Sequence, residues 1–435
     1  LFNLILHMKL WDKGGSTHEK IDFFTVGNDR ALDLFLAPYD VKASIAHAEM
    51  LASVGLLETE EVANLVTALA QIGKEITAGA FEIEADFEDI HSKIEFLLTE
   101  RLGDVGKKIH AARSRNDQVL VAMQLFLKDQ IQEIKTGSQD LFNLLISLAD
   151  KHAALLLPGY THLQVAMPSS FGLWFSSYAE SLIDDIFFLE AAYKVCDQNP
   201  LGSAAGYGSS FPIDRKMTTK ALGFNTLKYN VVAAQMGRGK TEKAMAFGMS
   251  AVAATVGKLA MDICLYMSQD LNFISFPDQL TTGSSIMPHK KNPDVFELIR
   301  AKCNKIQTLP AQLSQLTANL PSGYHRDLQL LKEVLLPAIT ELQSCLDLMH
   351  FALKEVIPNT TLGQNPKYDA MYSVDTLNEM VLQGMPFREA YKEMGAIIAK
   401  GEYQPKKDLN HTHLGSMGNL CLEEIKAKME AACDF

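Results

Sequence analysis

Long stretches with apolar residues at every third or fourth position constrain this chain more than any other feature. This spacing places apolar side chains on one face of an α-helix. It occurs in the segments 44–57, 60–76, 117–157, 167–196, 239–273, 294–318 and 327–356. The alternation of β-branched residues that is typical of strands is hard to find. We therefore predict an all-α fold, and helical segments of about 30 residues favour a bundle of long helices.

Breaks in the helical pattern suggest how the chain is divided. Glycines between positions 103 and 106 and a proline at position 358 predict three helical domains. These domains span residues 1–107, a central bundle domain of residues 108–358, and residues 359–435. Because several helices are apolar on a wide face, a bundle shared between subunits would bury more surface than one chain can, so we expect a homo-oligomer. Asp262 and Asp270 lie on apolar segments and need polar partners there.

Charge and cysteine usage narrow the class of protein. A net charge of -12 argues against nucleic acid as a partner, although a local group of cations is enough for a small anionic substrate. Six cysteines without CxxC spacing indicate reduced thiols in a cytoplasmic protein and give no sign of a metal site.

Neither apolar run in the chain predicts a membrane protein. The run at residues 1–11 lacks a basic flank and a cleavage site, so we expect no signal peptide. The apolar run at residues 244–257 is too short to span a bilayer and predicts a buried helix. We therefore expect no membrane partner.

The segment "GSSIMPHKKNPD", residues 283–294, joins two helical patterns. Asn292 suits the N-cap of a helix, Pro293 suits its first position, and the glycine before the serine pair lets the chain bend. Lys290 brings positive charge, and a serine beside such charge can act as a base because its hydroxyl pKa falls. The segment could also be a flexible polar connector, but the complete string with its helix start favours a functional loop.

The segment "HAARSRNDQ", residues 110–118, carries two arginines that can each pair a carboxylate through two hydrogen bonds. These are Arg113 and Arg115, and Asn116 adds an amide. A solvated helix end, capped by Asn116 or Asp117, explains the same residues about equally well.

Two histidines occur in polar segments. His162 follows Thr161 in "PGYTHLQVAMP", residues 158–168, where a carboxylate such as Glu297 could orient the ring and raise its basicity. His91 in "EDIHSKIE" is similar, with Glu88 or Asp89 beside it. Each histidine could instead cap a helix end.

The segment "LPSGYHRDLQLLKE", residues 320–333, places Tyr324, Arg326, Gln329 and Lys332 at the opening of a helix. These side chains could bind a polar substrate. Alone, the segment is explained as well by capping and solvation of that helix.

Together these segments resemble the aspartase/fumarase superfamily, whose signature loop is close to "GSSIMPHKKNPD". Within it they are similar to the argininosuccinate lyase family, because "SRNDQ" contains the first arginine that is typical there. "GYTHLQ", "LPSGYHRDLQ" and "GMPFREAY" fit the same family, and the resemblance covers most of the chain. It implies an all-α homotetramer whose central bundle pools helices from every subunit and whose active sites are built from several subunits. It also implies cleavage of argininosuccinate to arginine and fumarate, the last step of arginine biosynthesis, without a cofactor.

The resemblance also assigns roles to individual residues. Ser284 would remove the Cβ proton next to a carboxylate, and Lys290 and Asn292 would stabilise the aci-carboxylate that forms. His162, held by Glu297, would act as the acid for the departing guanidinium. The loop would close over the substrate and exclude water. Substrate-binding residues would be Arg115, Asn116, Thr161, Tyr324, Gln329, Lys332 and Arg238, with His91 lining the site and Asn28 and Asp33 as N-terminal candidates.

Two alternatives stand beside this interpretation. The chain could be another fumarate-releasing lyase, such as an adenylosuccinate lyase or a fumarase, but Arg115 and the Lys290–Lys291 pair speak against both. It could also be an inactive helical oligomer that kept only the fold. A chain without activity would have no chemical reason to retain Ser284, His162 and Glu297 together with Lys290.

Overall fold

The computed structural model describes residues 18–435, so the prediction about a signal peptide concerns residues outside this part of the chain. The chain forms two compact units, each built from three separate segments. Of the described residues, unit 1 contains residues 18–134, Phe188–Ser250 and Lys305–Leu342, and unit 2 contains Lys135–Phe187, Ala251–Asn304 and Gln343–Phe435. Five helices contribute residues to both units: α6 (Arg115–Lys151), α7 (Phe171–Cys196), α10 (Lys240–Tyr266), α11 (Asp294–Ile306) and α13 (Leu330–Leu353). The two units reflect which residues lie close together in space, not the Gly and Pro breaks along the sequence. The division into three domains therefore remains a prediction.

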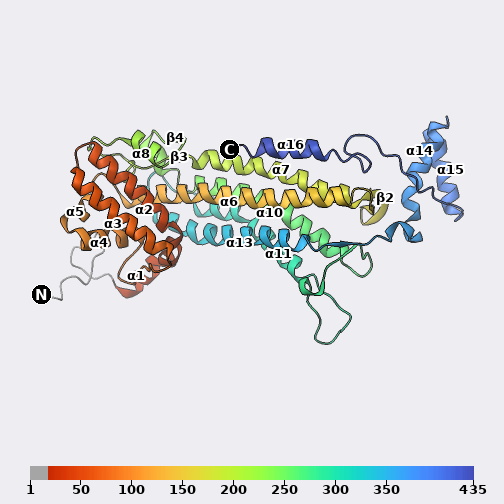
Figure 1. The fold of residues 1–435 in the computed structure, drawn as a ribbon, viewed down its shortest axis with the longest axis horizontal. Coiled ribbons are helices and arrows are strands. Elements are labelled where there is room, and N and C mark those ends of the chain that lie inside the picture. The colour runs from red at the N-terminus through yellow and green to blue at the C-terminus, as the bar shows by residue number, and fades with distance from the viewer. Residues whose placement is uncertain (1–17) are drawn as a thin grey trace. The chain divides into compact units, whose positions relative to one another are not determined.

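Unit 1 consists of helices and one short pair of strands (Figure 1). Strands β3 and β4 pair in parallel. Besides parts of the shared helices, its elements are α1 (Glu19–Val26), α2 (Asp29–Ser53), α3 (Thr59–Thr77), α4 (Ile90–Leu102), α5 (Asp104–Lys107), η1 (Lys108–His110), β3 (Gln198–Asn199), α8 (Arg215–Ala221), β4 (Thr226–Leu227), α9 (Val231–Gln235), α12 (Leu309–Leu316) and η3 (Arg326–Gln329).

Unit 2 contains the remaining elements and two antiparallel strand pairs, β1 with β2 and β5 with β6. Its own elements are β1 (Leu156–Thr161), β2 (Gln164–Ser170), β5 (Ile274–Ser275), η2 (Asp278–Leu280), β6 (Ile357–Pro358), η4 (Leu362–Gln364), η5 (Pro366–Tyr372), α14 (Ser373–Leu382), α15 (Phe387–Ala399) and α16 (Leu422–Ala432).

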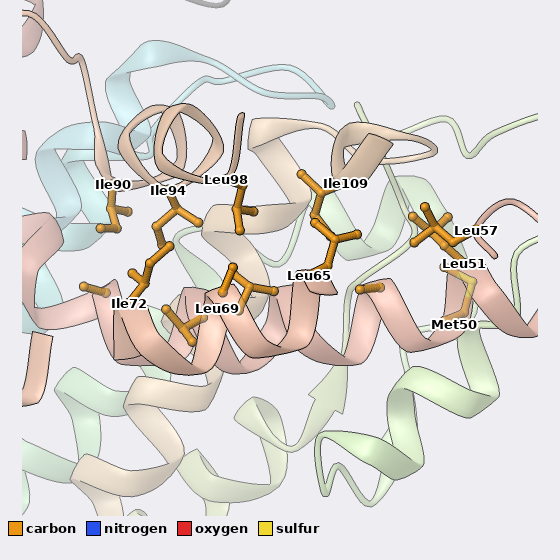
Figure 2. Packing of buried hydrophobic residues seen from close by; sticks show 14 of the residues in the cluster. Met50, Leu51, Leu57, Leu65, Leu69, Ile72, Ile90, Ile94, Leu98 and Ile109 are labelled. Carbon is orange, nitrogen blue, oxygen red and sulfur yellow. The ribbon is translucent and has the colours of Figure 1, made fainter. Parts of the chain in front are cut away.

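A well-packed apolar cluster holds α2, α3 and α4 together in unit 1 (Figure 2). Leu65, Leu69 and Ile72 lie on one face of α3, and Ile90 and Ile94 on the facing side of α4, all fully buried. The spacing of three and four residues puts them on a single stripe of each helix. The cluster therefore fixes α2, α3 and α4 against one another, and the start of α2 and the segment before α4 carry residues of the cavity described below.

The prediction of an all-α fold is confirmed only as a mostly helical fold, because residues 18–435 also form three short strand pairs, and the structure corrects several helix boundaries. The pattern at 117–157 ends as a helix at Lys151, because residues 156–170 form the hairpin β1–β2. Pro158-Gly159 is a bulge in this hairpin rather than a loop, and a Cβ on Gly159 would lie 2.8 Å from the carbonyl oxygen of Met167. Helix α10 ends at Tyr266, so Asp270 lies beyond it in an exposed turn and not on a helix.

Helix α10 is, within residues 18–435, the one helix long and apolar enough to cross a membrane by length and composition alone. However, 61% of its most apolar window is buried inside the protein, as predicted for residues 244–257. Asp262 on this helix accepts hydrogen bonds from Trp174 Nε1 (3.1 Å) and from Tyr178 Oη (2.6 Å). Asp262 thus has the polar partners that the sequence analysis required. Helix α10 packs as a core helix.

The cluster in Figure 2 gives a stability prediction. Replacing Leu69, which is 0% exposed, in the variant Leu69→Ala removes buried methyl groups and leaves a cavity. We expect the free energy of unfolding to fall by about 2–5 kcal/mol, as measured by urea denaturation. Leu382→Ala is the control, because Leu382 is 87% exposed, and it should stay within about 0.5 kcal/mol of the parent protein. Equal losses in the two variants would contradict the assignment of this core.

Candidate active site

Unit 1 contains a cavity of about 360 Å³ that gathers most of the predicted binding residues. It lies where the start of α2, the segment before α4, the start of α6 and the segment leading into α13 meet. Its lining combines several arginines and a lysine with aspartates, so it offers charges of both signs. The lining residues are Asp29, Asp33, Asp89, His110, Arg113, Ser114, Arg115, Asn116, Val119, Arg238, Tyr324, Arg326, Gln329 and Lys332.

Lys332 is the most deeply buried cation of the cavity, with 3% of its surface exposed. Its Nζ lies 2.7 Å from Asp29 Oδ1 and 2.6 Å from Asp33 Oδ1. Although burial opposes its charge, Asp33 and Asp29 raise the pKa of Lys332 above its ordinary value. Burial raises the pKa of Asp29 to about 6, against the opposing effect of Lys332. The ammonium group of Lys332 therefore forms ion pairs with the carboxylates of both Asp29 and Asp33.

Arg115 and Arg326 share a second pair of carboxylates in front of α4. Arg115 Nη1 lies 3.1 Å from Glu88 and its Nη2 pairs with Asp89, while Arg326 Nη2 lies 2.8 Å from Glu88. Although burial opposes its charge, Asp89 and Glu88 raise the pKa of Arg115. The guanidinium groups at this side of the cavity are thus held in place by fixed ion pairs.

Asp117 fixes the helix start that presents Arg115 and Asn116. Its carboxylate is fully buried and accepts hydrogen bonds from the backbone N–H groups of Ser114 (2.8 Å), Gly202 (3.0 Å) and Ala204 (2.9 Å). Asp117 therefore does hold this helix start, but it does so from inside α6 and in a buried setting, which corrects the prediction of a solvated end. This role coexists with a cavity-lining position for Arg115 and Asn116, so the two interpretations of this segment do not exclude each other.

Two of the remaining predicted binders of unit 1 are held by hydrogen bonds to backbone carbonyl oxygens. Arg238 Nη2 donates to the carbonyl oxygen of Leu328 (2.9 Å), and its Nε lies 3.3 Å from Glu242. Gln329 Nε2 donates to the carbonyl oxygen of Thr25 (2.9 Å), which closes α1 onto the cavity. Tyr324 is 38% exposed and has its side chain open to the cavity.

His91 is held by a different partner from those proposed. Its Nδ1 lies 3.0 Å from Asp40 Oδ1, and both side chains are 1% exposed. Asp89 instead caps α4 by accepting from the N–H of Ser92 (2.9 Å) and pairs with Arg115, which corrects the suggestion that Glu88 or Asp89 orients His91. Although burial opposes protonation, Asp40 raises the pKa of His91. His91 lies behind the cavity and is not among its lining residues.

The predicted catalytic loop lies in unit 2. Its base is closed where Thr282 and Asn292 exchange backbone hydrogen bonds of 3.3 and 2.8 Å, and the residues between them form an open excursion at the start of α11 (Figure 1). Ser284 Oγ accepts from the N–H groups of Met287 (3.1 Å) and Ile286 (3.4 Å). Lys290 is exposed, and Lys291 pairs with Asp278.

His162 lies at the tip of the hairpin β1–β2 rather than at a helix end. Thr161 and Gln164 pair across a two-residue turn made of His162 (φ 53°) and Leu163 (φ 59°). Such turns need the left-handed backbone conformation at both central residues. Residues other than Gly and Asn adopt this conformation at a cost in free energy. Backbone strain of this kind occurs preferentially at functional sites, and the tip is exposed to solvent.

Glu297 is exposed on the first turn of α11. Within residues 18–435 of one chain, no hydrogen bond or ion pair joins Glu297 to His162. The pairing of these two residues therefore stays a prediction. The sequence also missed Asp29 as a cavity residue, although Asp29 and Asp33 are four residues apart and so lie on one face of α2.

Comparisons with known proteins show which family the chain belongs to. A family model described as lyase matches residues 22–308. The argininosuccinate lyase of Parabacteroides distasonis is 56% identical over 97% of this chain and 95% of that protein, and the one of Bacteroides fragilis is 54% identical over 97% and 94%. The chain belongs to the argininosuccinate lyase family.

The family predicted from the motifs is thus confirmed, together with the enzyme class, a carbon–nitrogen lyase of arginine biosynthesis. A crystal structure of EDDS lyase in complex with formate has a similar fold, with a TM-score of 0.78 over 96% of this chain and 90% of that chain. The two sequences are 22% identical, so this likeness shows the fold alone.

The shared lysine gives a prediction that depends on pH. In Lys332→Met two buried carboxylates lose their cation, and we expect the free energy of unfolding at about pH 7.5 to fall by about 3–5 kcal/mol. The loss should shrink at about pH 5. A carboxylate whose folded pKa is raised, as that of Asp29 is, stabilises the fold at low pH and loses this effect as pH rises through the folded value.

Urea denaturation at both pH values measures this difference. Lys305→Met is the matched control, because the Lys305 side chain is 69% exposed where it pairs with Glu341. It should change stability by less than about 1 kcal/mol. A pH-independent loss in Lys332→Met would contradict the assigned ion pairs.

Proposed function

We propose that this member of the argininosuccinate lyase family cleaves argininosuccinate to arginine and fumarate by β-elimination, with Ser284 as the base. Ser284 Oγ takes the Cβ proton, and the electron pair moves onto the adjacent carboxylate as an aci-carboxylate. The C–N bond then breaks, a C=C bond forms, and the guanidino nitrogen leaves with a proton from His162. The observation that carries the substrate assignment is the mixed-charge cavity of unit 1, which suits an amino acid end better than a plain dicarboxylate.

The loop geometry supports Ser284 as the base. The N–H groups of Ile286 and Met287 point at its Oγ, and donors placed there stabilise the negative charge that a serine hydroxyl gains on losing its proton. Lys290 and Asn292 from the same loop provide the charge and amide that stabilise the aci-carboxylate. Closure of the loop over the substrate removes water, which strengthens these interactions.

We further propose that the active protein is a homotetramer whose sites combine segments from different copies. Large apolar side chains remain exposed on the long helices, and burial of such surface favours association. These are Phe187, Phe188, Phe247, Met261, Leu298, Leu348 and Phe351. The assignment also offers a partner for His162, since Glu297 of another copy can orient it. Cytoplasmic location fits the six cysteines, which are present as thiols and not as disulfides and three of which are buried.

The direct test is to mix the purified protein with argininosuccinate, adenylosuccinate or malate and follow the ultraviolet absorbance of fumarate. We expect fumarate from argininosuccinate. Fumarate from another substrate would support the elimination chemistry but contradict the assignment of argininosuccinate as the substrate. No fumarate from any of them would favour the inactive helical oligomer.

Ser284→Ala tests the base. We expect turnover with argininosuccinate to fall at least about a hundredfold, because a positioned base contributes this much, while circular dichroism and the oligomeric state stay unchanged. Ser285→Ala is the matched control, since Ser285 neighbours Ser284 in the same exposed loop. The proposal requires the control to keep most of its turnover, and near-normal turnover in Ser284→Ala would remove Ser284 from the mechanism.

Mixing two inactive variants tests whether copies share a site. Ser284→Ala alters unit 2, and Asn116→Leu blocks the cavity of unit 1 with a side chain of similar size. If each site combines these segments from different chains, an equal mixture that is unfolded and refolded together regains about a quarter of the parent activity. Each variant refolded alone is the control. No gain on mixing would contradict the sharing of Ser284 and Asn116 between copies.

A further inference from the structure

We infer that unit 2 contains a binding site for a free α-amino acid with an apolar side chain, in a cavity of its own. This cavity encloses about 440 Å³, which is a usual size for a small-molecule site. Its walls come from the start of β1, from the segment that contains η4 and η5, and from the segment between α15 and α16. All of these residues belong to unit 2, and none of them is assigned above to catalysis or substrate binding, so the inference does not depend on the proposed function.

The segment of residues 402–421 forms one wall of the cavity and is fixed by polar contacts. It connects α15 to α16 without a helix of its own. Tyr403 Oη lies 3.0 Å from Thr376 Oγ1, and Lys406 Nζ donates to Glu379 Oε2 (2.7 Å), so the segment is tied to α14. The wall is therefore held in place without a ligand, and the cavity is formed before anything binds, as is usual for small-molecule sites.

His411 is the first polar side chain of the lining. Its carbonyl oxygen accepts from the N–H of Gly418 (3.0 Å) and from Ser416 Oγ (2.7 Å), which fixes its backbone. Its Nε2 lies 2.6 Å from Asp375 Oδ1, and Asp375 does not line the cavity. A neutral ring that donates from Nε2 to a carboxylate keeps an acceptor at Nδ1. Nδ1 is therefore the ring nitrogen that can accept a hydrogen bond from a ligand.

Lys407 is the second polar side chain of the lining, and its side chain is 44% exposed. Its Nζ donates to the carbonyl oxygen of Gly363 (2.8 Å) and lies 3.1 Å from Asp369 Oδ1. These two contacts engage at most two of the three N–H donors of an ammonium group. Lys407 thus has a donor left for an acceptor of the ligand, and a carboxylate is the strongest such acceptor.

The charges of these four side chains favour a zwitterion. With a neutral imidazole, the carboxylates of Asp369 and Asp375 outnumber the single positive charge of Lys407, so a simple anion gains little in this cavity. A simple cation would find an acceptor at His411 but would leave the free donor of Lys407 without a partner. An α-amino acid satisfies both groups, because its carboxylate accepts from Lys407 while its ammonium donates to His411 in front of Asp375.

The rest of the lining selects an apolar side chain. Leu156, Leu409 and Met417 line the cavity and are only partly buried, so apolar surface remains open to solvent there. The ring of Tyr372, which is 3% exposed, adds an aromatic wall. Covering this surface with an apolar side chain contributes about 25 cal/mol for each Å² removed from water.

The first experiment measures binding to the assembled protein by calorimetry. The probes are L-phenylalanine, 3-phenylpropanoate, which lacks the ammonium group, and 2-phenylethylamine, which lacks the carboxylate. We expect phenylalanine to bind at least about tenfold more tightly than either analogue, because each analogue loses one charged hydrogen bond. An analogue that binds as tightly as phenylalanine, or a protein that does not bind phenylalanine, would overturn the inference.

Lys407→Met tests the carboxylate contact. We expect it to weaken phenylalanine binding about tenfold and to leave 2-phenylethylamine unchanged. Lys406→Met is the matched control, because Lys406 is the preceding residue, also forms an ion pair with the body of unit 2, and does not line the cavity. It should bind phenylalanine like the parent protein, and equal affinities in all three proteins would contradict the role of Lys407.

Ala154→Phe is a second variant that keeps Lys407 and its ion pair. Ala154 lines the cavity and is exposed, so a large side chain there occupies the space without opening a core. We expect phenylalanine binding to be lost. Binding at the parent affinity in Ala154→Phe would place the ligand elsewhere and overturn the inference, whatever the effect of Lys407→Met on the segment.

Hydrogen exchange followed by mass spectrometry locates the bound amino acid. Phenylalanine should slow exchange of the backbone N–H groups of residues 402–421, because a ligand stabilises a segment with few packed contacts. Residues 283–294, which are also exposed, should exchange at an unchanged rate. Protection at Arg115 and Asn116 without protection of residues 402–421 would place phenylalanine in the cavity of unit 1 and overturn the inference. None of these measurements uses turnover, so their failure is distinguishable from failure of the proposed function.

Discussion

The ion pairs of Lys332 impose the constraint on which the rest of unit 1 depends. A buried ammonium is costly unless carboxylates compensate it, and these carboxylates come from α2, which is about 300 residues earlier in the chain. The start of α13 is therefore fixed against the start of α2, and Gln329 closes α1 onto the same place. Glu88 and Asp89 complete the wall because Arg115 and Arg326 hold them there. The cavity is thus an outcome of charge compensation as much as of apolar packing.

Much of this could be predicted from the sequence because the physical signals are local. The stripe of Leu65, Leu69 and Ile72 predicts α3, and the Asn292-Pro293-Asp294 string predicts where α11 starts. Arg115, Asn116, Tyr324, Gln329 and Lys332 were identified within short polar motifs, and the structure places all of them around one cavity together with Arg238. The motifs, however, carry no information about which carboxylates these cations meet.

The features that could not be predicted depend on contacts between distant segments or on backbone conformations that sequence does not favour. The hairpin β1–β2 carries Pro158, Gly159 and Pro168, residues that strands usually avoid, and its turn uses His162 and Leu163 instead of the usual Asn and Gly. The partner of His91 is Asp40, which is 51 residues away, whereas the acidic neighbours in sequence serve other groups. The roles of Asp29 and Asp33 could not be predicted because they depend on ion pairs with Lys332, which is distant in the sequence.

The distribution of the candidate residues fits the demands of an elimination reaction. Substrate recognition needs fixed geometry, and the charged predicted binders of unit 1, Arg115, Arg238 and Lys332, are partly or fully buried and held by ion pairs. Deprotonation next to a carboxylate needs a site without water, yet Ser284 and His162 lie on an open loop and an exposed hairpin tip. Exposed segments with few packed contacts are the ones that can move at low cost. Under the proposed mechanism and assembly, Ser284 and His162 gain a dry environment when substrate and another copy of the chain cover them, so this proposal couples catalysis to binding and assembly.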